Sequence, residues 1–296
     1  MAANSRLNND DSSQIHRPFH RLLQRKVPDF LWHYTSAPGF HGIAKSSKIW
    51  ATQIQYLNDS QEFIEATGLC RSLLKQREHE QSEVWRKQLI SYLSESLRRI
   101  EKANVCVSSF TEENDLLSQW RGYCPPSGGY CLGIKSDFLV EQFKKVHFTI
   151  IPCVYKYAEK HELLVDAIDI TLPELLQTPE MDPERMQTVV EPIVQRFLAM
   201  IHEVAPIIKH PSFAEEKEWR AVSPLVPCNL LEFRTQAGIL KPYLEVPLEL
   251  NSTEVQVVVG PSPHSNLGVE SCMTLLTKYK IWYKPVECSS VPFRSL

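Results

Sequence analysis

Four short segments of the 296-residue chain combine hydrogen-bonding side chains with aromatic rings. Such a combination suits a partly desolvated pocket, in which the ring supplies apolar contact and the polar group orients the ligand. The segments are LWHYTS (31–36), YLNDSQEF (56–63), SQWRGY (118–123) and EKEWR (216–220). We therefore expect the candidate site to be built from them.

The last of these segments carries the carboxylates. If Glu218 and Arg220 lie on a strand, they share one face, because successive side chains alternate along a strand. Glu216 would share that face and is the second choice for a functional carboxylate. Two interpretations stay open: Glu218 is an ionised carboxylate of a site, or it is neutralised by an ion pair with Arg220.

The first segment carries His33, between Trp32 and Tyr34. On a strand the two aromatic side chains lie on the face opposite the histidine, and that face is expected to pack inward. A histidine among aromatic residues is either a ligand-binding group or a core residue with satisfied hydrogen bonds. Both interpretations stay open for His33.

The two middle segments are less specific. Asn58 and Asp59 come just before a helical pattern and have the composition of a helix cap, so they are mainly structural candidates that could also line a pocket. Trp120 and Tyr123 are either pocket or core aromatics, and Arg121 is either a pocket residue or a partner of a carboxylate.

Hydrophobic patterning predicts the elements that position these segments. Strands are predicted at about 30–34, 49–52, 105–110, 130–134, 147–155, 219–222, 243–248, 255–259 and 281–286. Helices are predicted at about 39–48, 60–102, 160–209 and 267–279. In the first long helical stretch Trp85, Leu89, Leu93, Leu97 and Ile100 fall on one face, which indicates core packing.

This order of elements predicts an α+β fold with a mixed, mostly antiparallel sheet. Strands dominate both ends of the chain and two helical blocks lie between them, which does not fit regular βαβ winding. We expect residues 1–27 to be a loosely ordered tail. Residues 28–296 are expected to form a single domain with helical insertions at about 60–102 and 160–209.

Composition limits the class of protein. A formal net charge of −3 argues against general binding to nucleic acid or to a membrane surface, and no apolar run is long enough to span a membrane. None of the eight cysteines forms a CxxC pair, so we expect no metal site and a reducing, cytoplasmic location. Ser108 and Ser109 could serve a pocket, but no G-x-S-x-G sequence surrounds them.

The four segments resemble, in their order and in their residues, the motifs of the DUF2971 family of largely uncharacterised bacterial proteins. The family pattern reads like HYTs, lND..EF, a serine-bearing strand with a W..Y segment, E.R, a VGP turn and a terminal PYR-like piece. Here the last two occur as Val259-Gly260-Pro261 and as SVPFR at 290–294. The resemblance runs from about Phe30 to Arg294.

The opening piece also resembles the first NAD-binding strand of ADP-ribosyltransferase-like folds. That resemblance implies that His33 and Thr35 bind the adenosine ribose of NAD, that Trp120 or Tyr130 stacks near the nicotinamide, and that Glu218 is the catalytic carboxylate. His33 is also implied in catalysis. The same resemblance places Tyr34, Ser109 and Arg220 among the cofactor-binding residues.

The expected function is therefore that of an NAD-using ADP-ribosyltransferase-like enzyme with an unidentified acceptor, of the kind found in toxins or defence effectors. The expected partner is NAD or a related nucleotide. The alternative is a non-catalytic ligand-binding or interaction module of the same fold. A metal-dependent hydrolase is disfavoured, because no His/Asp/Glu group has ligand spacing.

Overall fold

A computed structural model describes residues 20–57, 60–125, 128–236 and 238–292. The chain divides into two compact units. The sheet unit comprises residues 26–64, 103–156 and 206–296, and the helical unit comprises residues 1–25, 65–102 and 157–205. The two stretches expected as helical insertions, at about 60–102 and 160–209, thus make up most of the helical unit.

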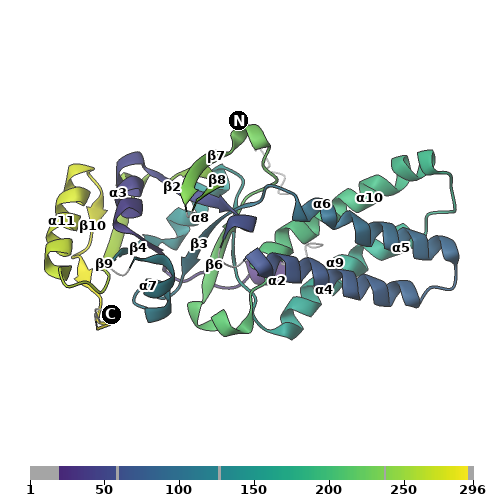
Figure 1. Cartoon of the computed structure of the whole chain (residues 1–296), viewed down its shortest axis with the longest axis horizontal. Coiled ribbons are helices and arrows are strands. Elements are labelled where there is room, and N and C mark those ends of the chain that lie inside the picture. Colours follow the sequence, from purple (N-terminus) through teal and green to yellow (C-terminus); the bar gives the residue numbers. More distant parts are fainter. Residues whose placement is uncertain (1–19, 58–59, 126–127, 237, 293–296) are drawn as a thin grey trace, which may run out of the picture. The chain divides into compact units, whose positions relative to one another are not determined.

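The sheet unit is built on eleven strands in the order β10-β9-β4-β1-β3-β2-β8-β7, with β6 paired to β3 and β5, and β11 paired to β9 (Figure 1). The strands are β1 Phe30–Thr35, β2 Lys48–Gln53, β3 Cys106–Thr111, β4 Tyr130–Lys135, β5 Thr149–Pro152, β6 Glu218–Val222, β7 Glu232–Gln236, β8 Ile239–Pro247, β9 Glu254–Val259, β10 Trp282–Tyr283 and β11 Glu287–Cys288. All pairs are antiparallel except β10 with β9 and β11 with β9. The predicted mixed, mostly antiparallel α+β fold is confirmed.

Four helices belong to the sheet unit: α3 Ala37–Ser46, α7 Leu117–Tyr123, α8 Ser136–Lys145 and α11 Ser265–Lys278. The larger hydrophobic core joins one face of β1, β3, β4, β6 and β9 to α3, α8 and α11. A smaller core lies on the other face of β1 and consists of Trp32, Tyr34, Trp120, Cys131 and Val258. Strand β1 therefore separates two apolar clusters, as alternation of its side chains requires.

Strand β1 is fixed in the sheet along its whole length. Each of its six residues is paired with β4, from Phe30 opposite Lys135 to Thr35 opposite Tyr130. Opposite Trp32 stands Gly133, where a Cβ atom would lie 2.5 Å from the indole ring. The absence of a side chain at Gly133 thus makes room for the ring of Trp32 on the sheet.

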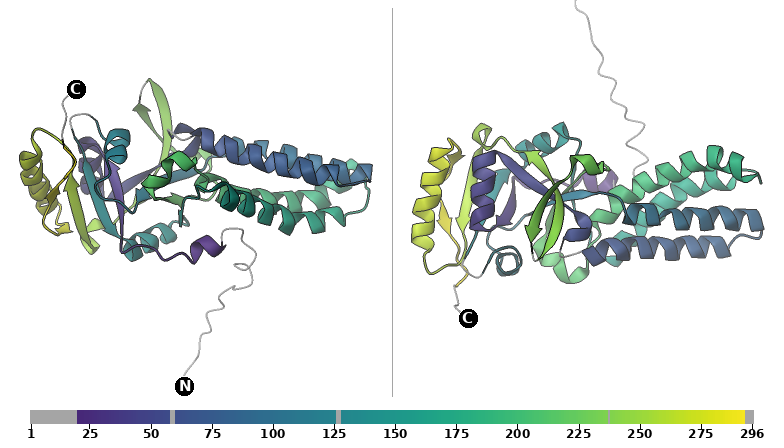
Figure 2. Two further views of the ribbon diagram at one scale, coloured as in Figure 1. Left: turned by 90° about the horizontal axis from the view of Figure 1, so that it is seen from below. Right: turned by 45° about the horizontal axis from the view of Figure 1, so that its top comes forward.

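The helical unit contains α2 His20–Leu23, most of α4 Ser60–His79, α5 Val84–Ser96, α6 Arg98–Glu101, α9 Tyr157–Leu176 and α10 Pro183–Val204. The long helices α4, α5, α9 and α10 run side by side in both views of Figure 2. Leu89, Leu93, Leu97 and Ile100 are fully or almost fully buried, as their spacing predicts, whereas Trp85 of the same predicted stripe is only partly buried. None of the helices in the described ranges is long and apolar enough to cross a membrane.

Two helices of the sheet unit are absent from the sequence prediction, namely α7 and α8. The second long helical block also ends earlier than predicted: α10 stops at Val204, and Pro206 follows within a short 3-10 turn at Ala205–Ile207. Pro206 has no backbone N–H to donate to the carbonyl of His202, although α10 continues through Pro192 in its interior. Lys209, expected at the end of a helix, therefore belongs to the sheet unit.

Candidate functional site

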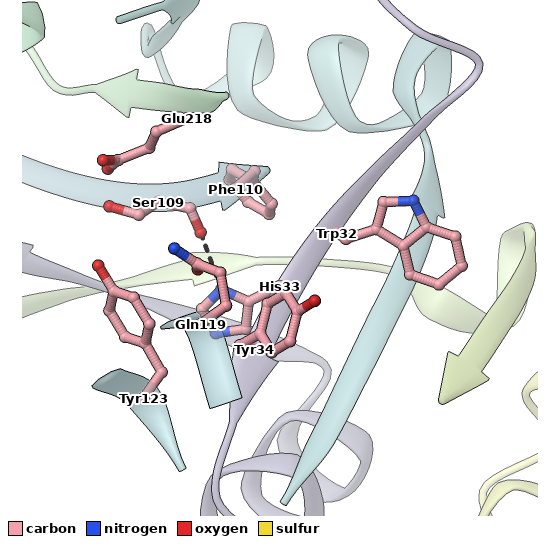
Figure 3. Close-up of a pocket in the computed structure, with 8 residues that line it drawn as sticks. All are labelled: Trp32, His33, Tyr34, Ser109, Phe110, Gln119, Tyr123 and Glu218. Atoms are coloured by element: carbon pink, nitrogen blue, oxygen red, sulfur yellow. Dashed lines mark hydrogen bonds between the residues drawn. The ribbon is translucent and has the colours of Figure 1, made fainter. Parts of the chain in front are cut away.

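One pocket of the sheet unit brings together residues from three of the four polar-aromatic segments. It holds about 280 Å³ of empty space, part of it open to solvent. Its lining residues come from β1, β3, α7 and β6, and Figure 3 shows them: Trp32, His33, Tyr34, Ser109, Phe110, Gln119, Tyr123 and Glu218. Of the predicted site residues, His33, Tyr34, Ser109 and Glu218 thus share one pocket.

The pocket lies where the sheet forks. Strand β3 pairs with β6 along one edge, from Val107 to Thr111. Its other edge is shared, because β2 pairs with Cys106 and Val107 whereas β1 pairs at Thr111. Between these two points no strand of the described residues pairs with β3 on that edge, and the backbone carbonyl of Ser109 accepts a bond from a side chain instead.

The imidazole of His33 lies at this fork and lines the pocket. Its Nδ1 lies 3.0 Å from the carbonyl oxygen of Ser109 (Figure 3). A carbonyl can only accept, so Nδ1 carries the proton and donates. Alternation places His33 and Tyr34 on opposite faces of β1, yet both line the pocket because the ring of His33 lies where the ladder is interrupted.

The environment keeps His33 neutral. Burial lowers the pKa of His33 below its ordinary value, against the opposing effect of the bond to Ser109. In the neutral ring with a proton on Nδ1, Nε2 is an acceptor. Nε2 has no hydrogen bond to any residue in the described ranges, so it is available to a donor on a ligand, such as a hydroxyl group.

Glu218 is buried and paired with two cations. Its Oε2 lies 2.5 Å from Nζ of Lys209, and its Oε1 lies 2.8 Å from Nε of Arg220. Burial raises the pKa of Glu218, but the charges of Arg220 and Lys209 outweigh this effect and lower it to about 2. Glu218 is therefore ionised at neutral pH. The sequence left open a free carboxylate or an ion pair with Arg220, and the structure has the ion pair.

Lys209 is the residue that sequence reasoning missed. Its side chain is completely buried, and Nζ also lies 2.7 Å from the carboxylate of Glu216 and 5.0 Å from the ring centroid of Phe213. Arg220 is 2% exposed and donates from Nη1 to the carbonyl of Pro206 at 2.6 Å. We call Lys209, Glu216, Glu218 and Arg220 the ion cluster; its four formal charges sum to zero.

Helix α7 carries Gln119 and Tyr123, which lie four residues apart and therefore on one side of the helix. The hydroxyl of Tyr34 holds the start of this helix, because it accepts from the backbone N–H of Leu116 at 2.9 Å and donates to the carbonyl of Glu113 at 3.0 Å. Both hydrogen bonds of the Tyr34 hydroxyl are therefore made to backbone groups of the protein. The ring of Tyr34 lines the pocket.

Trp120 also anchors α7. Its ring packs edge-on against Tyr34 with centroids 4.6 Å apart, and its Nε1 donates to Asp115 at 2.7 Å. A Cβ atom at Gly260 would lie 2.8 Å from the ring of Trp120, so the glycine of the Val259-Gly260-Pro261 turn is needed for this packing. Trp120 is therefore a core residue beside the pocket.

The remaining candidates lie outside the lining. Tyr130 stacks on Phe40 with centroids 4.6 Å apart. Thr35 is at the end of β1, where its carbonyl accepts from Sγ of Cys124, and Arg121 is exposed. The expected stacking position near the nicotinamide is filled neither by Trp120 nor by Tyr130 in the described pocket. Asn58 and Asp59 lie outside the described residues.

The described residues hold no cluster of three metal-ligating side chains, and all eight cysteines are free. Most of the cysteines are buried, as expected for small apolar side chains.

Comparison with known families gives one match. The model of the family described as "Protein of unknown function (DUF2971)" matches residues 119–221, roughly a third of the chain. No curated protein and no solved structure matches the sequence. The matched stretch begins at Gln119 in the pocket and includes the ion cluster and all of β6 except Val222. Over residues 119–221 the chain is similar to DUF2971.

Proposed function

We propose that this chain is an ADP-ribosyltransferase-like enzyme that binds NAD in the fork of the sheet and transfers ADP-ribose to an unidentified acceptor. The observation that supports it is the shared pocket of His33 and Glu218, two residues that are 185 positions apart in the sequence. In this reaction the bond between nicotinamide and ribose breaks, and nicotinamide leaves with the electron pair. The acceptor forms the new bond to the sugar carbon and loses a proton.

The residues that line the pocket indicate what can enter. The aromatic lining from Tyr34, Phe110 and Tyr123 suits a planar ring. Nε2 of His33 would accept from a ribose hydroxyl.

Glu218 would act as a fixed negative charge. Breaking the bond to nicotinamide places positive charge on the ribose, and a preorganised carboxylate in a site shielded from water stabilises it. A carboxylate offers about four lone-pair sites, and Lys209 and Arg220 take three of them: one on Oε1 and two on Oε2. The remaining site on Oε1 is the one open to a ribose hydroxyl.

A non-catalytic ligand-binding module is the second candidate, and the ion cluster favours it. Two cations contact Glu218 directly, so the field of the carboxylate at the sugar would be largely cancelled. A pocket of this kind could hold a nucleotide without cleaving it.

Calorimetry with NAD and an assay of nicotinamide release separate the two candidates. The enzyme predicts that Glu218→Gln lowers turnover by about 10²-fold or more. Glu216→Gln is the matched control, because it loses a contact with the same Lys209 but does not line the pocket. Binding without turnover in the parent protein supports the binding module, and equal turnover in parent and Glu218→Gln removes Glu218 from its role.

Glu218→Gln also breaks a buried ion pair, so each variant needs a thermal melting curve. If Glu218→Gln melts below the assay temperature, the double variant Lys209→Met/Glu218→Gln removes one positive and one negative charge of the ion cluster together. Glu216 and Arg220 remain, so the charges of the cluster still sum to zero.

A further inference from the structure

Gln119 is the buried polar residue of the pocket whose side chain has no partner. It is 6% exposed, and its amide makes no hydrogen bond to any residue in the described part of the chain. Figure 3 shows this amide directed into the space between Ser109, Tyr123 and His33. The amide thus lines a pocket that is partly open to solvent, and a ligand that replaces water there can make hydrogen bonds to it without displacing a protein partner.

The chemistry of the lining defines that ligand. A primary amide offers one acceptor oxygen and two donors, and the group that matches it in both roles is another carboxamide or a similar donor-acceptor edge. Ser109, which lines the same pocket, has a hydroxyl that likewise makes no hydrogen bond to a described residue. These groups are neutral, as is His33.

The described lining residues offer no cation to an anionic head group. Among the described lining residues Glu218 is the charged one, and its charge is negative. The cations Lys209 and Arg220 are both bound to carboxylates and do not line the pocket. A ligand carboxylate would therefore face Glu218 without a cation and without a donor-acceptor match at the Gln119 carbonyl.

We infer that Gln119 is a specificity-determining residue that recognises a carboxamide on the ligand ring through paired donor and acceptor contacts. This inference rests on the proposed binding of NAD, and it names the part of NAD that enters the fork: the nicotinamide ring with its carboxamide. The matching acid, in nicotinic acid adenine dinucleotide, should be rejected.

Calorimetric titration of the full chain with NAD and with nicotinic acid adenine dinucleotide tests the inference. The parent should bind NAD at least about tenfold more tightly, the equivalent of one hydrogen bond. Gln119→Met keeps the shape of the side chain without its amide. It should weaken NAD binding by about tenfold and bring the two affinities close together.

Thermal melting supplies a second readout. Because the Gln119 amide has no protein partner, Gln119→Met should melt at the same temperature as the parent or higher. A lower melting temperature would show that the amide has a structural role, and it would overturn the inference. Tyr283→Phe, which changes an exposed hydroxyl at the far side of α11, is a control that should leave both affinities unchanged.

The outcomes distinguish the inference from the proposed function. If the parent binds NAD and Gln119→Met keeps the full preference over the acid, the inference is wrong and the NAD site stands. If the parent binds neither dinucleotide, both are wrong. A preference that disappears in Gln119→Met supports both.

Discussion

Glu218 in the sheet unit and His202 in the helical unit are both buried titratable groups with a lowered pKa, for opposite reasons. Glu218 contacts Lys209 and Arg220, whose charges hold its pKa at about 2 and keep it ionised. His202 lies on α10 and is 6% exposed, and its Nε2 has no partner within the described structure. Burial lowers the pKa of His202 to about 4 and keeps it neutral.

The difference shows what a buried group needs in order to stay charged. In the ion cluster the attraction of oppositely charged partners outweighs the cost of burying a charge. A buried group without such partners is instead stable in its neutral form. The same rule applies within the pocket. Its wall at β6 carries a paired charge, and its wall at α7 carries the neutral, unpaired amide of Gln119. Glu218 on β6 already has its partners within the fold, whereas the amide of Gln119 on α7 is suited to bind a ligand.

The largest effect is expected from Lys209→Met. It leaves Glu216 and Glu218 buried without their common cation, and breaking a buried pair in this way costs about 3–5 kcal/mol of the free energy of unfolding. Urea denaturation followed by circular dichroism measures the loss. The matched control is Lys284→Met, whose exposed pair with Glu254 at 3.7 Å should be worth about 0–1 kcal/mol. If the two variants lost the same free energy of unfolding, the buried pairs of Lys209 would be worth no more than the exposed pair of Lys284.

The second effect depends on pH and belongs to His202. Its folded pKa of about 4 lies below the ordinary value of 6.5, so the unfolded chain binds the proton first as the pH falls. Its contribution to stability is complete above pH 6.5 and is lost progressively down to about pH 4. His202→Leu should remove this loss and gain up to about 3 kcal/mol over the parent near pH 4.

Denaturation of the parent and His202→Leu at several pH values between 7.5 and 4 checks this expectation. The two stability curves should run parallel above pH 6.5 and separate below it. A constant difference at every pH would mean that His202 does not titrate in this range. Glu218 titrates lower, since its pKa falls from 4.5 to about 2, so its own contribution is lost only below about pH 4.5 and does not obscure the result.

A smaller loss is expected from Tyr34→Phe. The variant leaves the backbone N–H of Leu116 and the carbonyl of Glu113 without the hydroxyl that they share, which should cost about 1–3 kcal/mol. Thermal denaturation measures it, with Tyr283→Phe as the control because its hydroxyl is exposed. A loss equal to that of the control would mean that the hydroxyl of Tyr34 does not hold α7 in place.

Local signals predicted the elements with clear patterns. β1 is an aromatic run. The helix predicted at 39–48 is α3 at Ala37–Ser46, which starts two residues earlier because Ser36 caps it and a proline lies in its first turn. The stripe from Leu89 to Ile100 predicted the buried face of the first helical block. The strands at 105–110 and 219–222 were likewise found within one or two residues of β3 and β6.

The site itself depended on contacts between distant residues. Helix α7 has only seven residues and contains Gly122, so its stability comes from Tyr34 and Asp115 rather than from its own sequence. Lys209 was hidden at the end of an apolar stretch; Pro206 was the signal that the helix had already ended. The fork could not be predicted, because it arises when β1 and β2 share one edge of β3.

The pairing of Gly133 with Trp32 has a consequence for how relatives of this chain can diverge. Any side chain at position 133 would collide with the indole ring at 2.5 Å, so neither position can accept a larger residue while the other stays as it is. The two positions are therefore expected to co-vary in evolution, with a residue bearing a Cβ atom at 133 tolerated only together with a smaller one at 32. An alignment of homologous sequences would reveal this as a correlated pair that joins the residue before His33 to its partner on β4.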